Sequence, residues 1–167
     1  MLPKKAHSTD SGFDLSAHTI KRLYVHGGGN GERMIDGTTD EGAELISKRY
    51  MVDGKLQLQY LERALIGTGI KATAGVGYEL QIRPRSGLAL KRGLTVLNTP
   101  GTIDEAYREE IGVVIINNSR QVQTIEPGER IAQLVVMAVE LPEIEVVGTL
   151  PEPHSDRDGG FGSTGVK

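Results

Sequence analysis

Cysteine is absent from this chain of 167 residues, and large aromatic residues are scarce. Without cysteine there can be no disulfide, no thiolate metal site and no cysteine nucleophile, and the composition suits a reducing compartment. The chain has no Trp, two Phe and five Tyr, so its core must be built from aliphatic side chains. A chain of this length can form one domain around a single core.

An excess of positive charge and long apolar runs are missing as well. The net charge is −3 at pH 7, which argues against nonspecific nucleic-acid binding, because that needs clustered Lys and Arg. The longest aliphatic stretch, residues 134–139, is too short to cross a bilayer, and the N-terminus shows no signal-peptide pattern. We therefore expect a cytoplasmic protein that binds neither nucleic acid nor membrane. The four His residues show no metal-binding spacing.

Short strand patterns dominate the chain. Four runs are alternating or continuously apolar: residues 56–61, 76–82, 112–116 and 134–139. Turn residues separate them at short intervals, among them the hairpin dipeptide Asp53-Gly54. The pattern predicts an all-β subunit, a jelly-roll-like antiparallel sandwich. It predicts one short helix over residues 86–91, with Ser86 as N-cap and Gly93 as its end.

The C-terminal residues 159–165 combine four glycines with Phe161, Ser163 and Thr164. Glycines expose backbone N–H groups that can bind anions, hydroxyls add donors, and a Phe ring offers a face for stacking. These features fit a nucleotide. A frayed linker is the alternative, since chain ends of this composition are commonly loose. We expect residues 151–167 to form a flexible arm that closes over a site on a domain of residues 1–150.

Four further segments rich in glycine and charge precede the arm: residues 10–15 (DSGFDL), 84–89 (PRSGLA), 101–108 (GTIDEAYR) and 128–134 (GERIAQL). In this order and spacing, the five motifs closely resemble those of the trimeric deoxyuridine triphosphatase family, over residues 2–17 and about 67–165. The resemblance implies a jelly-roll homotrimer that hydrolyses dUTP to dUMP and pyrophosphate with Mg²⁺. Such an activity limits the incorporation of uracil into DNA and supplies dUMP.

The third motif carries the predicted chemistry. Hydrolysis needs a base that orients and deprotonates a water in line with the α-phosphate, and the resemblance assigns that role to Asp104. The alternative is that Asp104 only caps a turn. Tyr107 is placed where its ring can pack against the sugar and exclude a 2′-hydroxyl, or it is an ordinary strand aromatic. By resemblance, the hairpin with Asn98, Thr102 and Ile103 reads the uracil edge.

The remaining site residues belong to the other motifs. Arg85, Ser86 and Gly87 combine a cation, a hydroxyl and a backbone N–H, which suits a phosphate, and the resemblance adds Gln133 to this network. Asp14 is expected to contact Mg²⁺ through water, because this ion keeps several waters. Arg130 is either a ligand contact or a structural ion pair.

In the arm, the resemblance implies that Phe161 stacks on uracil while Gly162, Ser163 and Thr164 approach the nucleotide. Arg157 is expected at the γ-phosphate. The family usually has one more Gly between this Arg and the Phe, so the contact that Arg157 makes stays open.

Residues 18–66 depart from the family pattern and form an insertion, with glycines at 27–29 and 31 and acidic residues over 36–44. It is either a surface hairpin or a docking surface for another protein. Two alternative functions remain. A dCTP deaminase of the same superfamily would need a Glu in the strand after the third motif, where Val114 stands. A regulatory protein, switched by nucleotide, would use the insertion to bind a partner.

Overall fold

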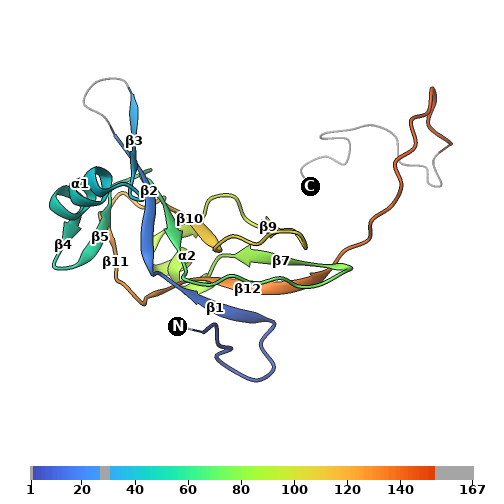
Figure 1. The fold of residues 1–167 in the computed structure, drawn as a ribbon, viewed down its shortest axis with the longest axis horizontal. Helices are drawn as coiled ribbons and strands as arrows, with labels where there is room; N and C mark the ends of the chain where they lie inside the picture. The colour runs from blue at the N-terminus through green and yellow to red at the C-terminus, as the bar shows by residue number, and fades with distance from the viewer. Residues whose placement is uncertain (1, 27–30, 153–167) are drawn as a thin grey trace, which may run out of the picture.

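The computed structural model describes residues 2–26 and 31–152. All strand pairs of the described residues are antiparallel, in three sheets of four, five and three strands, so the predicted all-β class is confirmed. Figure 1 shows the sheets in one body, with a helix at one end and the last described residues leaving the other. Two helices lie in the described residues rather than the predicted one, and neither is long and apolar enough to cross a membrane.

Sheet A has the strand order β1-β12-β7-β9 and contains residues of the first, third and fourth motifs. Its members are β1 (Gly12–Ser16), β12 (Arg130–Ala138), β7 (Tyr78–Arg83) and β9 (Gly101–Ile103). The predicted strands at 76–82 and 134–139 are found as β7 and the second half of β12. The long β12 pairs with β1 on one side and with β7 on the other.

Sheet B has the order β3-β2-β6-β10-β8, and sheet C has the order β11-β5-β4. Sheet B consists of β2 (Thr19–His26), β3 (Glu32–Asp36), β6 (Arg63–Gly67), β8 (Leu94–Val96) and β10 (Gly112–Asn117). Sheet C consists of β4 (Met51–Val52), β5 (Lys55–Leu58) and β11 (Gln123–Ile125). All three sheets contribute to one aliphatic core cluster, as the composition predicts.

The insertion contains a helix that the sequence analysis missed, α1 (Asp40–Tyr50). The Thr39 hydroxyl accepts the Gly42 N–H at 3.1 Å, the first turn is acidic and the last is basic. Each of these features stabilises a helix. The chain then reverses at Asp53 and Gly54, with φ of 51° and 75°. Two positive φ angles are those of a type I′ turn, so the predicted hairpin, between β4 and β5, is confirmed.

The insertion is part of the core. Strand β6, at the end of the insertion, pairs with β10, β2 pairs with β6 and β3 pairs with β2, so the insertion supplies three strands of sheet B. Leu23, Val25, Ile35, Ile46 and Leu58 are all buried in the common cluster. The expectation of a surface hairpin is therefore wrong, because these apolar side chains face the same core as the motif-bearing strands.

The second helix, α2 (Ser86–Arg92), lies where the sequence predicts it. Its N-cap is Arg85 and not Ser86, because Ser86 already has helical geometry and no side chain caps this end. Gly93 ends the helix in the left-handed conformation, with φ of 65°, and its N–H donates to the Ala89 carbonyl. This conformation costs glycine little, since it has no Cβ.

Replacing Leu58 tests whether the insertion supports the core. Leu58 is 0% exposed, so Leu58→Ala is expected to lower the free energy of unfolding by about 2–5 kcal/mol, through lost apolar burial and a residual cavity. The matched control is Leu90→Ala in α2, where the side chain is 87% exposed. Denaturant titration compares the two variants. A Leu58→Ala protein as stable as the control would show that the insertion folds apart from the core.

Candidate active site

The pairing of β12 aligns residues of the first and fourth motifs with the end of β7. Asp14 of β1 lies opposite Gln133 of β12, which in turn lies opposite Arg83 of β7. The Gln133 amide reaches beyond the ladder and donates to the Pro84 carbonyl at 2.8 Å. A Cβ at position 12 would lie 2.4 Å from Oε1 of Gln133, so Gly12 gives this amide its room. The register thus places the second motif directly beside the other two.

The Asp14 carboxylate bridges two guanidinium groups. One oxygen accepts from Nε of Arg85 at 2.9 Å, and the other accepts from Nη1 of Arg130 at 3.0 Å. Asp14 is only 16% exposed at its side chain, whereas Arg130 is 54% exposed. Arg85 also donates to the Arg130 carbonyl at 3.3 Å. Of the two alternatives for Arg130, the structure displays the ion pair.

A cleft of about 540 Å³ opens beside this cluster. The predicted residues Asp14, Arg85, Ser86, Gly87 and Gln133 all line it. Lys91 and Arg92 of α2 add two cations that the sequence analysis missed. The Arg92 guanidinium is already engaged in hydrogen bonds, because it donates to Glu129, to Gln123 and to the Thr124 carbonyl. With Asp14 paired, the cleft has the cations and hydroxyls that a polyphosphate needs.

A second, smaller pocket of about 120 Å³ lies at the third motif. The predicted residues Asn98, Thr102, Ile103 and Tyr107 line it. Gly101 of the third motif also lines it, and the other walls come from Ile82, Ile111 and Gly112, which were not predicted. Ile82 and Gly112 lie in the predicted strands at 76–82 and 112–116, but a strand pattern does not say which residues reach a pocket. The pocket combines an amide with aliphatic walls, which suits one flat polar ring.

The turn after β9 holds Asp104 close to this smaller pocket. The Tyr107 N–H donates to the Asp104 carbonyl at 3.1 Å, and the Tyr107 hydroxyl donates to the Glu110 carbonyl at 2.9 Å. The hydroxyl of Thr73 donates to the Glu105 carbonyl at 3.1 Å. Asp104 itself is exposed and lines neither pocket. Within one subunit, the two pockets share no lining residue, so the predicted site residues form two separate groups.

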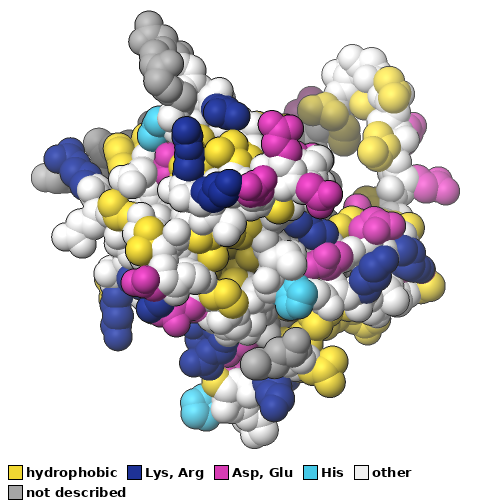
Figure 2. Space-filling view, turned by 60° about the vertical axis from the view of Figure 1, so that its left-hand side comes forward, with side chains coloured by type: hydrophobic (Ala, Val, Ile, Leu, Met, Phe, Trp, Pro, Cys, Tyr) yellow, Lys and Arg dark blue, Asp and Glu magenta, His cyan; other side chains and the backbone are white. Residues whose placement is uncertain are grey.

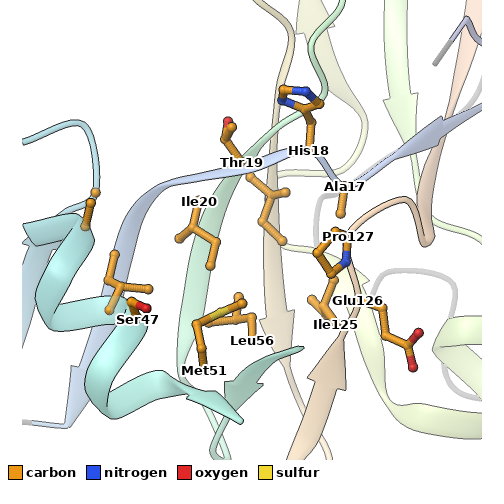
Figure 3. A pocket seen from close by; sticks show the side chains of 14 residues that line it. Ala17, His18, Thr19, Ile20, Ser47, Met51, Leu56, Ile125, Glu126 and Pro127 are labelled. Carbon is orange, nitrogen blue, oxygen red and sulfur yellow. The ribbon is translucent and has the colours of Figure 1, made fainter. Parts of the chain in front are cut away.

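A mostly apolar cavity of about 320 Å³ lies elsewhere, between α1 and the sheets (Figure 3). Figure 3 shows Ile20 of β2, Met51 and Ile125 directed into it from different elements. No predicted site residue lines this cavity. Figure 2 shows acidic and basic side chains interspersed over the face that it draws.

The residues of the larger cleft fit a divalent cation that binds mainly to the phosphates of a nucleotide and to water. Among residues 2–26 and 31–152, no three His, Cys, Asp or Glu side chains gather into a metal-binding group. Both oxygens of Asp14 accept from Arg85 and Arg130. Mg²⁺ keeps several waters and is commonly bound by one or two carboxylates plus phosphates. A contact of Asp14 through water agrees with this donor set. The predicted arm residues Arg157, Phe161, Gly162, Ser163 and Thr164 lie outside the described residues.

Glu110 ends the turn that follows β9, and its pKa is shifted. The hydrogen bond from the Lys21 ammonium, together with that from the Gly69 N–H, holds the pKa of Glu110 below its ordinary value of 4.5, although desolvation opposes the shift. A carboxyl whose pKa falls on folding stabilises the folded state above the unfolded pKa. That contribution is lost as pH falls through the folded pKa.

Acid titration of stability checks this assignment. From pH 4.5 downward, the thermal midpoint of the parent is expected to fall more steeply than that of Glu110→Gln, which has no proton to bind. The matched control is Glu109→Gln, because the neighbouring Glu109 side chain is 80% exposed and lies 3.7 Å from Lys71. Equal slopes for the parent and Glu110→Gln would contradict the assignment.

Known proteins share both the sequence and the fold. The dUTPase family model matches residues 51–165. The deoxyuridine 5′-triphosphate nucleotidohydrolase of a Picosynechococcus species is 56% identical over 166 residues, which is 99% of this chain and 92% of the relative. Its alignment therefore includes the insertion. The protein of the same name from a Hydrogenobaculum species is 53% identical over 119 residues, 71% of this chain and 81% of the relative.

Solved structures agree on the fold. The dUTPase of Staphylococcus bacteriophage 80alpha, solved with dUpNHpp, has a TM-score of 0.67 at 22% identity, and the match covers 99% of this chain and 92% of that one. At this identity the likeness concerns the fold alone. Since the family model covers more than half of the chain, and a relative matches almost all of it, the chain belongs to the dUTPase family.

Proposed function

We propose that this protein hydrolyses dUTP to dUMP and pyrophosphate with Mg²⁺, in the cytoplasm. The observation that carries the proposal is the division of the motif residues into a cationic cleft and a small pocket with an amide and aliphatic walls. A nucleoside triphosphate has the two matching parts. Relatives that are named for deoxyuridine 5′-triphosphate support the choice of nucleotide.

Asp104 is the general base of the proposed reaction. Its carboxylate accepts a proton from a water that attacks the α-phosphorus, the bond from that phosphorus to the bridging oxygen breaks, and pyrophosphate leaves. The Asp104 carboxylate is exposed, and hydrogen bonds to the backbone carbonyls of Asp104 and Glu105 fix the turn that carries it. Both features support this role. A fixed base positions the water without an ordering cost during the reaction.

Tyr107 and the smaller pocket account for the choice of substrate. The Tyr107 hydroxyl is occupied by the Glu110 carbonyl, so the ring offers the sugar a fixed apolar face. A 2′-hydroxyl against that face would lose its water without gaining a partner. Asn98, Thr102 and Ile103 read the base edge, and buried polar groups left unpaired by a wrong base would cost binding.

Arg85, Ser86, Gly87 and Gln133 bind the phosphates in the proposed complex. Asp14 holds Arg85 by Nε, which leaves other N–H groups of the guanidinium for an anion. Bound Mg²⁺ supplies charge neutralisation for the phosphates, with Asp14 contacting it through water.

We further propose a homotrimer in which each site takes residues from more than one subunit. The two pockets of one chain share no lining residue. Beyond β12, the extended segment carries Leu141, Ile144, Val146 and Leu150 at 81–95% exposure. Apolar side chains in such number favour burial against another chain. The following arm, with Arg157, Phe161, Gly162, Ser163 and Thr164, then closes over a nucleotide site.

The two other functions have less support. Val114 lies in β10 opposite Leu65, so the Glu that a dCTP deaminase needs there is absent. A docking role for the insertion remains a proposal. The described surface of α1 is charged, with Asp40, Glu41, Lys48 and Arg49 at its ends, which favours solvent contact over an apolar interface.

Changing Asp104→Asn tests the base. The variant keeps the shape of the side chain but cannot accept the proton, so kcat for dUTP is expected to fall by about 10²–10⁴ while binding is retained. Pyrophosphate release and binding of a non-hydrolysable analogue measure the two effects. Glu105→Gln, one residue on along the same turn, is the control and keeps the parent rate. Near-parent turnover by Asp104→Asn would rule out the assignment.

Mixed oligomers test the shared site. A chain with Asp104→Asn keeps its arm, and a chain truncated after Gly148 keeps its base, so each homotrimer is expected to be nearly inactive. Co-refolded mixtures recover part of the parent activity, because some sites take the base from one variant and the arm from the other. Native mass spectrometry confirms the mixed trimers. If confirmed mixtures stay inactive, each subunit carries a self-contained site.

A further inference from the structure

One ion pair connects the insertion with the catalytic turn. Nζ of Lys21, on β2, lies 2.9 Å from Oε2 of Glu110, and the two side chains are 28% and 25% exposed. The other oxygen of Glu110 accepts the Gly69 N–H at 2.7 Å. A Cβ at position 67 would lie 2.4 Å from that oxygen, so Gly67 lets the carboxylate lie against the end of β6. The carboxylate is therefore fixed from two sides.

The backbone next to Glu110 is fixed as well. The Ile111 N–H donates to the Ile70 carbonyl at 2.8 Å. The Ile111 carbonyl accepts from the Thr68 hydroxyl at 2.8 Å and from the Thr68 N–H at 3.1 Å. The Glu110 carbonyl then accepts the Tyr107 hydroxyl at 2.9 Å. Glu110 is thus the point at which the turn over residues 104–110 joins the rigid sheet.

No other ion pair in the described part of the chain joins residues 18–66 to residues 101–111. Lys48 pairs with Glu44 inside α1, and Lys55 pairs with Glu126. Arg63 pairs with Glu32, both within the insertion. Among the ion pairs of the described residues, the link from the insertion to the turn therefore depends on Lys21, while His18 adds a weaker charge effect on Glu110.

We propose that Lys21 and Glu110 are positioning residues, through which the insertion fixes the Tyr107 ring and thereby the discrimination between deoxyribose and ribose. Loss of the ammonium frees the Glu110 side chain and shifts the carbonyl that holds the Tyr107 hydroxyl. The ring then gains freedom, and a 2′-hydroxyl meets less resistance. This inference rests on the proposed dUTP hydrolysis.

Steady-state kinetics with dUTP and UTP test the proposal. Lys21→Met removes the charge and keeps the chain length, and Glu110→Gln keeps an acceptor for Gly69. Each is expected to raise KM for dUTP, and to lower the ratio of dUTP to UTP kcat/KM, by roughly three- to tenfold, with a smaller change in kcat. Lys21→Arg restores most of the ratio, and the double variant loses little more than either single one. Lys48→Met, which removes an exposed pair of the insertion, behaves as the parent.

Hydrogen exchange without nucleotide supplies a second readout. Amides over residues 104–110 are expected to exchange faster in Lys21→Met than in Lys48→Met. Parent-like selectivity and exchange in Lys21→Met would overturn the proposal. A lowered midpoint with an unchanged dUTP to UTP ratio would also overturn it, because the pair would then serve stability alone. If the parent itself fails to hydrolyse dUTP, the proposed function is wrong, and exchange still decides whether Lys21 positions the turn.

Discussion

The register of β12 with its two neighbours is the constraint on which the candidate site depends. Side chains alternate faces along a strand, so a slip of one residue would turn every side chain to the other face. In the observed register, Asp14 and Gln133 are direct partners across the β1–β12 ladder, and Gln133 reaches the Pro84 carbonyl before α2. Three segments that are distant in the sequence thus form one cleft wall, and the apolar faces of the same strands fix the register by their burial.

The same strand pairing places the Asp14 carboxylate among the cationic side chains of the cleft. This carboxylate lowers the mutual repulsion of the cations in the free protein. It also fixes the orientation of Arg85 and Arg130, which lie 2.9 and 3.0 Å from it. Arg92 has a different task, because its donors fasten α2 to Glu129 and to the β11 segment. The cleft can therefore be strongly cationic toward a ligand while the helix that lines it stays anchored.

The sequence predicted local features well. The Asp53-Gly54 turn and the Gly93 helix end follow from residue type and spacing, whereas most of the motif residues that line the two pockets were predicted from the family resemblance. It missed α1, whose capping residue Thr39 was readable but whose few apolar residues gave a weak periodic pattern. Contacts between distant residues were beyond its reach. The pairing of Lys21 with Glu110 joins residues that are 89 positions apart, and only the packing of β2 on β6 brings them together.

Strand β2 gives the insertion both a place in sheet B and a contact with Glu110. Without it, β6 would present an unpaired edge, which is a hazard for aggregation. With it, the outer edge passes to β3, where Glu32 forms an ion pair with Arg63 of β6 across β2. The pairing that covers β6 also fixes the backbone around Lys21, and the shift in register between Ile20 and Arg22 falls at this residue. Because the same backbone hydrogen bonds cover the edge and place the ammonium, the insertion cannot be removed without changing the surroundings of Glu110.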